Sequence, residues 1–143
     1  MLMLVSEWLK LHPIHAGIVR KDWGLDLIMQ ALLSNSRLHD LYVLDAEDKV
    51  IGHLSYKKLA KLTLADHCGS HTRSELLERI TPGSASELMD VHFASTKADE
   101  ELSQILYRQL DHWVEDLPVL DDQGKLQGVI NLSDILFAVM KAG

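Results

Sequence analysis

The chain has 143 residues, of which 47% are hydrophobic and 24% are charged. This length suits one compact domain or two small units that share a core, and it excludes a large multidomain enzyme. No apolar run reaches the roughly 18–20 residues that span a bilayer, so we expect no membrane insertion. The net charge of −7, with scattered Lys and Arg residues, disfavours a nucleic-acid or anionic-membrane partner. A single Cys residue permits no internal disulfide, which favours a reducing, cytoplasmic location.

The sequence contains two copies of one unit. Residues 41–59 and 117–135 align without a gap, and Leu, Val, Leu, Asp, Lys and Gly recur in register. After a one-residue adjustment the alignment continues upstream and pairs His15 with His92. Because an internal repeat decides the whole fold, each element is predicted twice.

The first copy is predicted to be strand, helix, strand, strand and helix. Apolar residues after Asp22 recur at the spacing of a helix with one buried face. Two short apolar runs, residues 42–44 and 51–54, flank a polar turn and predict a β-hairpin. Residues 55–61 return to helical spacing, and Ser55 is a favourable N-cap residue.

The connector that follows contains a loop-like stretch at residues 66–71 and a short predicted helix at 74–80. His67-Cys68-x-x-His71 has residue types that bind transition metals, but a structural zinc site usually draws on a second, separated pair of ligands. No such pair is near in the sequence, so we predict a solvated loop and no metal site. A reactive thiol at Cys68 is the other alternative.

The second copy repeats the same pattern. A helical stretch follows Asp99, and the apolar runs 118–120 and 127–130 flank a turn in which Gly124 can supply a positive φ. Residues 131–140 form the last predicted helix, with Asn131 as its N-cap.

These elements define an α+β (α/β) fold made of two β-α-β-β-α motifs. We predict a first motif with an N-terminal helix at residues 1–62, a connector at 63–85 and a second motif at 86–143. Neither unit can bury a sufficient core alone, so we expect the two to pack with pseudo-twofold symmetry and to create paired clefts.

Residues 117–136 closely resemble the second half of a cystathionine-β-synthase-type (CBS) motif, and the first copy resembles a more divergent one. The chain from Trp8 to Met140 is therefore similar to a tandem CBS pair, or Bateman module. The resemblance implies a regulatory module that binds AMP, ADP, ATP or S-adenosylmethionine between its two motifs, without an obligatory cofactor. It also implies a homodimer that signals to an unidentified protein partner. No catalytic motif is present in the sequence, so we predict no enzyme.

In this family the strand-to-helix junction reads Gly-x-x-Thr/Ser-x-x-Asp. The hydroxyl and the helix N-terminus face a phosphate, and the carboxylate accepts hydrogen bonds from the ribose hydroxyls. The second copy keeps the acceptor, Asp134, but has Asn131 in place of the hydroxyl residue. The first copy has the hydroxyl of Ser55 but places Lys58, which can only donate, at the acceptor position. We therefore expect at most one good nucleotide site, around Asp134.

Further residues are expected to line this site, namely Leu117, Pro118 and Val114 as an apolar wall and His92 or Phe93 beside the base. Structural alternatives apply to most of them. Asp134 can serve the helix dipole, Asn131 and Ser55 can be simple N-caps, and Pro118 can be a backbone device.

Two other functions compete with nucleotide sensing. Lys58 and Asn131 depart from the nucleotide pattern, which favours a ligand-free dimerisation or protein-interaction module. A segment associated with an ion channel or transporter is the third possibility. The apolar stretches Trp8-Leu9 and 136–140 are candidate dimer surfaces.

Overall fold

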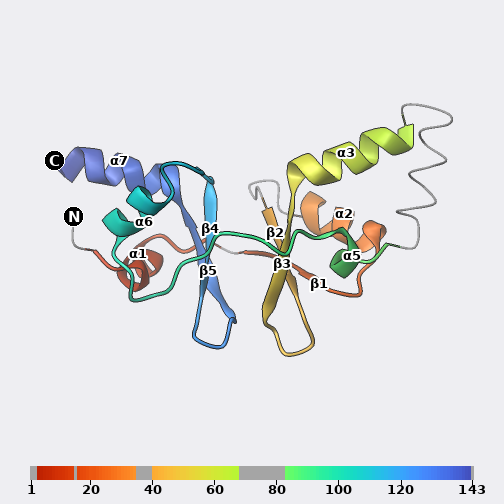
Figure 1. Ribbon diagram of the computed structural model, residues 1–143, viewed down its shortest axis with the longest axis horizontal. Coiled ribbons are helices and arrows are strands. Elements are labelled where there is room, and N and C mark those ends of the chain that lie inside the picture. Colours follow the sequence, from red (N-terminus) through yellow and green to blue (C-terminus); the bar gives the residue numbers. More distant parts are fainter. Residues whose placement is uncertain (1–2, 15, 35–39, 68–82, 143) are drawn as a thin grey trace. The chain divides into compact units, whose positions relative to one another are not determined.

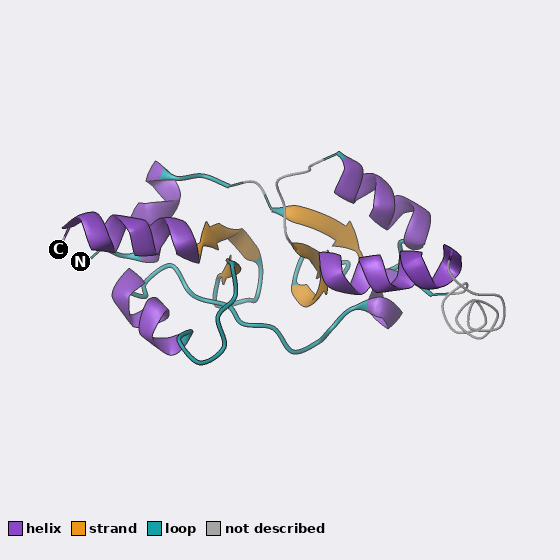
Figure 2. Cartoon of the chain, turned by 90° about the horizontal axis from the view of Figure 1, so that it is seen from above, coloured by secondary structure: helices purple, strands orange, loops and turns teal. Residues whose placement is uncertain are grey.

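The computed structural model describes residues 3–14, 16–34, 40–67 and 83–142 (Figure 1). The chain divides into two compact units. We call Gly17–Phe93 the first-copy unit, and Ala94–Gly143 together with Met1–Ala16 the second-copy unit. Both units combine a small sheet with helices (Figure 2), which confirms the predicted α+β fold. Within the described residues, no helix has the length and apolar character needed to cross a membrane.

The first-copy unit contains a three-stranded sheet of order β1-β2-β3, in which β1 is parallel and β3 antiparallel to β2. Its elements are β1 (Gly17–Arg20), α2 (Leu25–Leu33), β2 (Asp40–Leu44), β3 (Val50–Ser55), α3 (Tyr56–His67) and α5 (Ala85–Leu88). Ile28, Leu41 and Leu54 are fully buried in its core. The alternation of buried and exposed side chains along β1 explains why a short apolar run forms a strand here.

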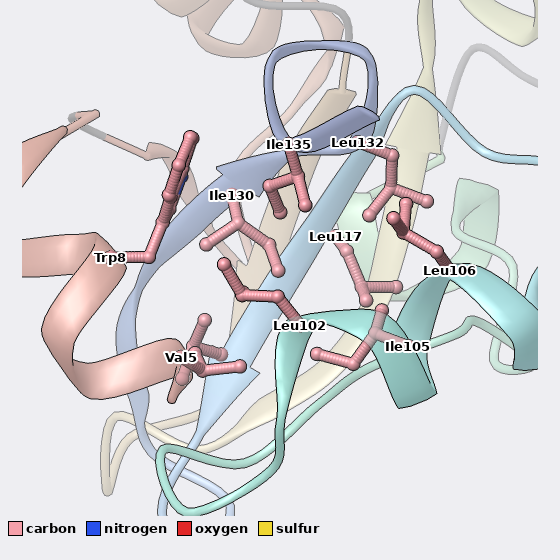
Figure 3. Packing of buried hydrophobic residues seen from close by; sticks show 10 residues of the cluster. Val5, Trp8, Leu102, Ile105, Leu106, Leu117, Ile130, Leu132 and Ile135 are labelled. Carbon is pink, nitrogen blue, oxygen red and sulfur yellow. The ribbon is translucent and has the colours of Figure 1, made fainter. Parts of the chain in front are cut away.

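The second-copy unit is built around an antiparallel hairpin. Its elements are α1 (Val5–Leu11), α6 (Leu102–Arg108), β4 (Asp116–Leu120), β5 (Leu126–Asn131) and α7 (Leu132–Ala142). Buried side chains from all five elements form one core (Figure 3), and the labelled members are Val5, Trp8, Leu102, Ile105, Leu106, Leu117, Ile130, Leu132 and Ile135.

Both predicted hairpin turns are present and share one hydrogen-bond pattern. The side chain of Asp45 accepts the N–H groups of the residues two and four positions further on, at 2.8 and 3.0 Å. Asp121 does the same at 2.8 and 2.9 Å. The bond from the residue four positions on is the main cause that lowers the pKa of Asp45. The left-handed position is occupied by Gly124 (φ 82°) in one turn, as predicted, and by Asp48 (φ 66°) in the other.

The first strand of the second copy is shorter than predicted. It is reduced to a single parallel bridge between Thr96 and Val119, whereas β1 pairs with β2 along four residues. The N–H of Thr96 donates to the carbonyl of Pro118 at 3.0 Å, and the N–H of Leu120 donates to the carbonyl of Thr96 at 2.9 Å. The donor needed to continue this pairing toward Ala94 would be the N–H of residue 118, which proline lacks. Pro118 therefore has a clear backbone role.

The N-terminal helix lies in the second-copy unit, whereas the sequence analysis had placed it with the first motif. The N–H of Val5 donates to the carbonyl of Glu100 at 2.9 Å, and Trp8 is only 4% exposed in the core of this unit. The apolar side chains of α1 pack in one core with residues of α6 and β5.

Helix α5 docks on the first-copy unit in the same manner. The N–H of Ala85 donates to the carbonyl of Trp23 at 2.8 Å, which corresponds to the bond between Val5 and Glu100. Ser-Glu occurs at equivalent positions of the two helices, residues 6–7 and 86–87, and also at residues 74–75. The matching backbone hydrogen bonds, rather than this dipeptide, show that the repeat extends further upstream.

Glu100 stabilises the turn before α6. Its carboxylate accepts hydrogen bonds from the hydroxyl of Thr96 at 3.0 Å, from the N–H of Lys97 at 3.2 Å and from the guanidinium of Arg108. Burial raises the pKa of Glu100, but the hydrogen bonds together outweigh burial and hold the pKa below its ordinary value.

This lowered pKa predicts a pH-dependent contribution to stability. A carboxyl group whose pKa is lower in the folded state stabilises the fold above its unfolded-state pKa, and the contribution is lost as pH falls through the folded-state pKa. We expect Glu100→Gln to reduce the free energy of unfolding at neutral pH, and the difference from wild type to shrink in acid. Urea unfolding at several pH values measures this, with Glu101→Gln as the neighbouring control. A difference that is independent of pH would contradict the assignment.

Candidate functional site

The junction between β5 and α7 brings Asn131 and Asp134 together. Asn131 is the last residue of β5, and its side-chain oxygen accepts the N–H of Asp134 at 3.0 Å, which is the geometry of an N-cap. Its Nδ2 donates to Oδ1 of Asp116 at 3.1 Å. Both polar atoms of the Asn131 side chain are therefore used inside the unit.

Asp134 lies in the first turn of α7 and is exposed. Among the described residues, its carboxylate makes no hydrogen bond and no ion pair. An ionised carboxylate is an acceptor only, with two oxygens that can each take a hydrogen bond. Asp134 is thus a free acceptor at the position where the resemblance to the CBS motif predicts a ribose contact.

Most residues of the predicted apolar wall belong to the hydrophobic core of the second-copy unit. Leu117 is fully buried, and its side chain packs in the hydrophobic cluster of the second-copy unit (Figure 3). Pro118 is also buried. Val114 is half-buried against the same cluster and keeps some surface. Core packing alone therefore explains why Leu117 is apolar. Val114 keeps some exposed surface that a ligand could contact.

The corresponding junction in the first-copy unit is arranged differently. Ser55 caps α3, since its hydroxyl oxygen accepts the N–H of Lys58 at 3.1 Å. The Nζ atom of Lys58 donates to Oδ1 of Asp90 at 3.2 Å. Asp90 lies 32 residues further along the chain, so no local sequence pattern could have indicated this ion pair.

The predicted site residues are divided between the two units. Ser55, His92 and Phe93 belong to the first-copy unit, whereas the residues around Asp134 belong to the second-copy unit. His92 is exposed, and the ring of Phe93 meets the ring of His53 edge-on with centroids 6.0 Å apart. His15, the repeat partner of His92, lies outside the described residues.

The predicted connector loop begins later than expected, because α3 continues through His67. Neither Gly nor Pro occurs between Tyr56 and Gly69, so this stretch contains no residue that would end the helix earlier. Cys68, His71 and the predicted helix at 74–80 lie outside the described residues. In the part of the chain that the structure describes, no group of three or more His, Cys, Asp or Glu residues could hold a metal ion.

Comparison with known proteins found a family match for the second copy and solved structures with the same fold. Residues 85–141 match the family model of the CBS domain. A CBS-domain-containing protein from Thermotoga maritima has the same fold, with 22% identity, a TM-score of 0.71 and coverage of 97% of this chain and 95% of that chain. The second copy thus matches the CBS domain, and the fold that this chain shares with the Thermotoga maritima protein extends over both copies.

Two further solved structures share this fold and were determined with ligands. CBSX2 in complex with AMP is 19% identical, with a TM-score of 0.69 and coverage of 89% of both chains. The CBS domain pair of protein MJ0100, in complex with 5′-methylthioadenosine and S-adenosyl-L-methionine, is 14% identical, with a TM-score of 0.70 and coverage of 100% of both chains. A search of the curated proteins found no match.

Proposed function

We propose that this chain is a regulatory CBS module that binds an adenosyl ligand at the β5–α7 junction. The free, exposed carboxylate of Asp134 is the observation that carries the proposal. Structures with the same fold were determined with AMP and with S-adenosyl-L-methionine, which supports this class of ligand. Ligand binding shifts the population of conformations, and a partner protein reads the change. The module acts in the cytoplasm and needs no obligatory cofactor.

The chemistry of the junction favours the ribose as the recognised group. Asp134 offers two acceptor oxygens to the two neighbouring hydroxyls of a ribose, in hydrogen bonds that its charge strengthens. Asn131 contributes by orienting the first turn of α7, because its own donor is already bonded to Asp116. Any phosphate contact here therefore depends on the backbone N–H groups and the positive end of α7.

Calorimetric titration of the full chain with AMP, ADP, ATP and S-adenosylmethionine tests the proposal. We expect saturable binding of at least one ligand and a loss of about 10- to 100-fold in affinity for Asp134→Asn, since a hydrogen bond to a charged group contributes about 1.5–3 kcal/mol. Asp111→Asn is the matched control, because it removes another exposed carboxylate of the same unit. Equal affinity of the Asp134 variant and wild type would contradict the role of Asp134.

The alternative is a ligand-free dimerisation or interaction module, which two observations favour. Asn131 and Lys58 are both bonded within their own units. Helices α6 and α7 also expose Tyr107, Phe137 and Met140, at 76%, 61% and 66%. We propose a homodimer that uses this apolar surface, without Trp8, which is buried in the core. A dimer in sedimentation that binds none of the four ligands would favour this second function.

A further inference from the structure

We propose that the ion pair between Lys58 and Asp90 closes the first-copy junction to a ribose, so that each chain takes one adenosyl ligand, at Asp134. This inference rests on the proposed function, because it gives the number of adenosyl ligands per chain and the residues that determine this number.

The polarity of the side chains at this junction does not suit a ribose. Lys58 aligns with Asp134, three residues after the N-cap Ser55. An ammonium group only donates hydrogen bonds, so it cannot accept hydrogen bonds from the ribose hydroxyls. The carboxylate beside it, that of Asp90, lies 3.2 Å from Nζ and is engaged by that charge. A ribose that approached this position would have to compete with Lys58 for the carboxylate of Asp90.

The backbone of Asp90 is fixed close to the same junction. The N–H of His53 donates to the carbonyl of Asp90 at 3.0 Å, and the N–H of Asp90 donates to the carbonyl of His53 at 2.9 Å. Asp90 is therefore held against β3 by two backbone hydrogen bonds in addition to the ion pair. A Cβ atom at Gly52 would lie only 2.9 Å from the Asp90 carbonyl oxygen, which shows how closely this segment lies on the strand.

The second copy lacks both the ion pair and the backbone bridge to the strand. The residue after Leu9 in α1 corresponds to Asp90. It is part of the helix, because α1 continues through Leu11. Gly128 is approached there by the side chain of Leu9, at 3.0 Å from an ideal Cβ atom. In the described part of this unit, no isolated backbone bridge is formed at Val129, the equivalent of His53. The two junctions thus differ in the side chain at the expected ribose position and in the backbone segment that lies on the strand. These two properties determine whether a ribose can bind.

Calorimetry of wild type and of the double variant Lys58→Asp, Asp90→Ser tests the proposal. The double variant provides an acceptor at residue 58 and removes its partner carboxylate. We expect one ligand per wild-type chain and two per double-variant chain, with AMP as the first probe. Lys57→Asp is the control and is expected to bind one ligand, because it keeps the ion pair between Lys58 and Asp90 and places a carboxylate at an exposed position that does not align with Asp134. Circular dichroism verifies that each variant is folded.

The outcomes separate this inference from the proposed function. Two ligands per wild-type chain, or one per folded double-variant chain, would overturn the inference and leave the proposed function intact. No binding by wild type would overturn the proposed function, and one ligand gained by the double variant would then still support closure. If the double variant does not fold, an NMR titration of wild type decides. The amide signals of His53 and Ser55 are expected to stay unchanged with AMP, and saturable shifts there would contradict closure.

Discussion

Trp8→Ala is expected to lower the free energy of unfolding by about 3–5 kcal/mol, the range for removing a buried aromatic side chain. Trp8 is 4% exposed and packs in the core of the second-copy unit with residues such as Leu102 and Ile130 (Figure 3). Its ring also stacks on the ring of His12, with centroids 4.0 Å apart. The substitution leaves a large cavity and also removes the contact that anchors α1. Urea denaturation followed by circular dichroism measures the loss.

Leu11→Ala provides the matched control on the same helix. Leu11 is 64% exposed, so we expect a change within about 0.5 kcal/mol. A Trp8→Ala effect as small as that of Leu11→Ala would show that α1 does not belong to the core, and would contradict the assignment of residues 1–16 to the second-copy unit.

Gly52→Ala is expected to have the second largest effect, a loss of about 2–3 kcal/mol from overpacking. A Cβ atom at this position would lie 2.4 Å from Sδ of Met89 and 2.9 Å from the carbonyl oxygen of Asp90. The Met89 side chain can move, but the backbone of Asp90 is bonded to His53 and cannot give way without breaking that bridge. Thermal and urea unfolding would quantify the loss.

Gly128→Ala is the control for this prediction, because Gly128 is the repeat partner of Gly52. A Cβ atom there would lie 3.0 Å from Cδ2 of Leu9, the far end of a flexible side chain. We expect a loss of under about 1 kcal/mol, since the neighbour can adjust. Equal losses at the two glycines would contradict the close approach of Asp90 to β3.

The parts of the fold that depend on local chemistry could be predicted from the sequence. Both hairpins follow from apolar runs around a turn, and Gly124 was correctly identified as the residue with positive φ. Asp45 and Asp121 show why these turns form, since each side chain binds the N–H groups of its own turn. The N-caps Ser55 and Asn131 were likewise predicted and are present.

The features that the sequence analysis missed depend on residues far apart in the chain. The placement of α1 follows from tertiary packing, which no local sequence pattern indicates. The ion pair of Lys58 joins residues 32 positions apart. A backbone role is one of the two alternatives that the sequence leaves open for Pro118, but the shortening of the strand beside it depends on the pairing of Thr96.

The central claim is that an adenosyl ligand binds at the β5–α7 junction through Asp134. A heteronuclear NMR titration of the full chain with AMP, ADP, ATP and S-adenosylmethionine in turn tests it most directly. The account predicts that at least one ligand shifts the amide signals of Asn131, Ser133 and Asp134 along a saturable curve, and that these shifts are lost in Asp134→Asn. The absence of shifts at this junction with all four ligands, or shifts confined to the junction of Ser55 and Lys58, would contradict it.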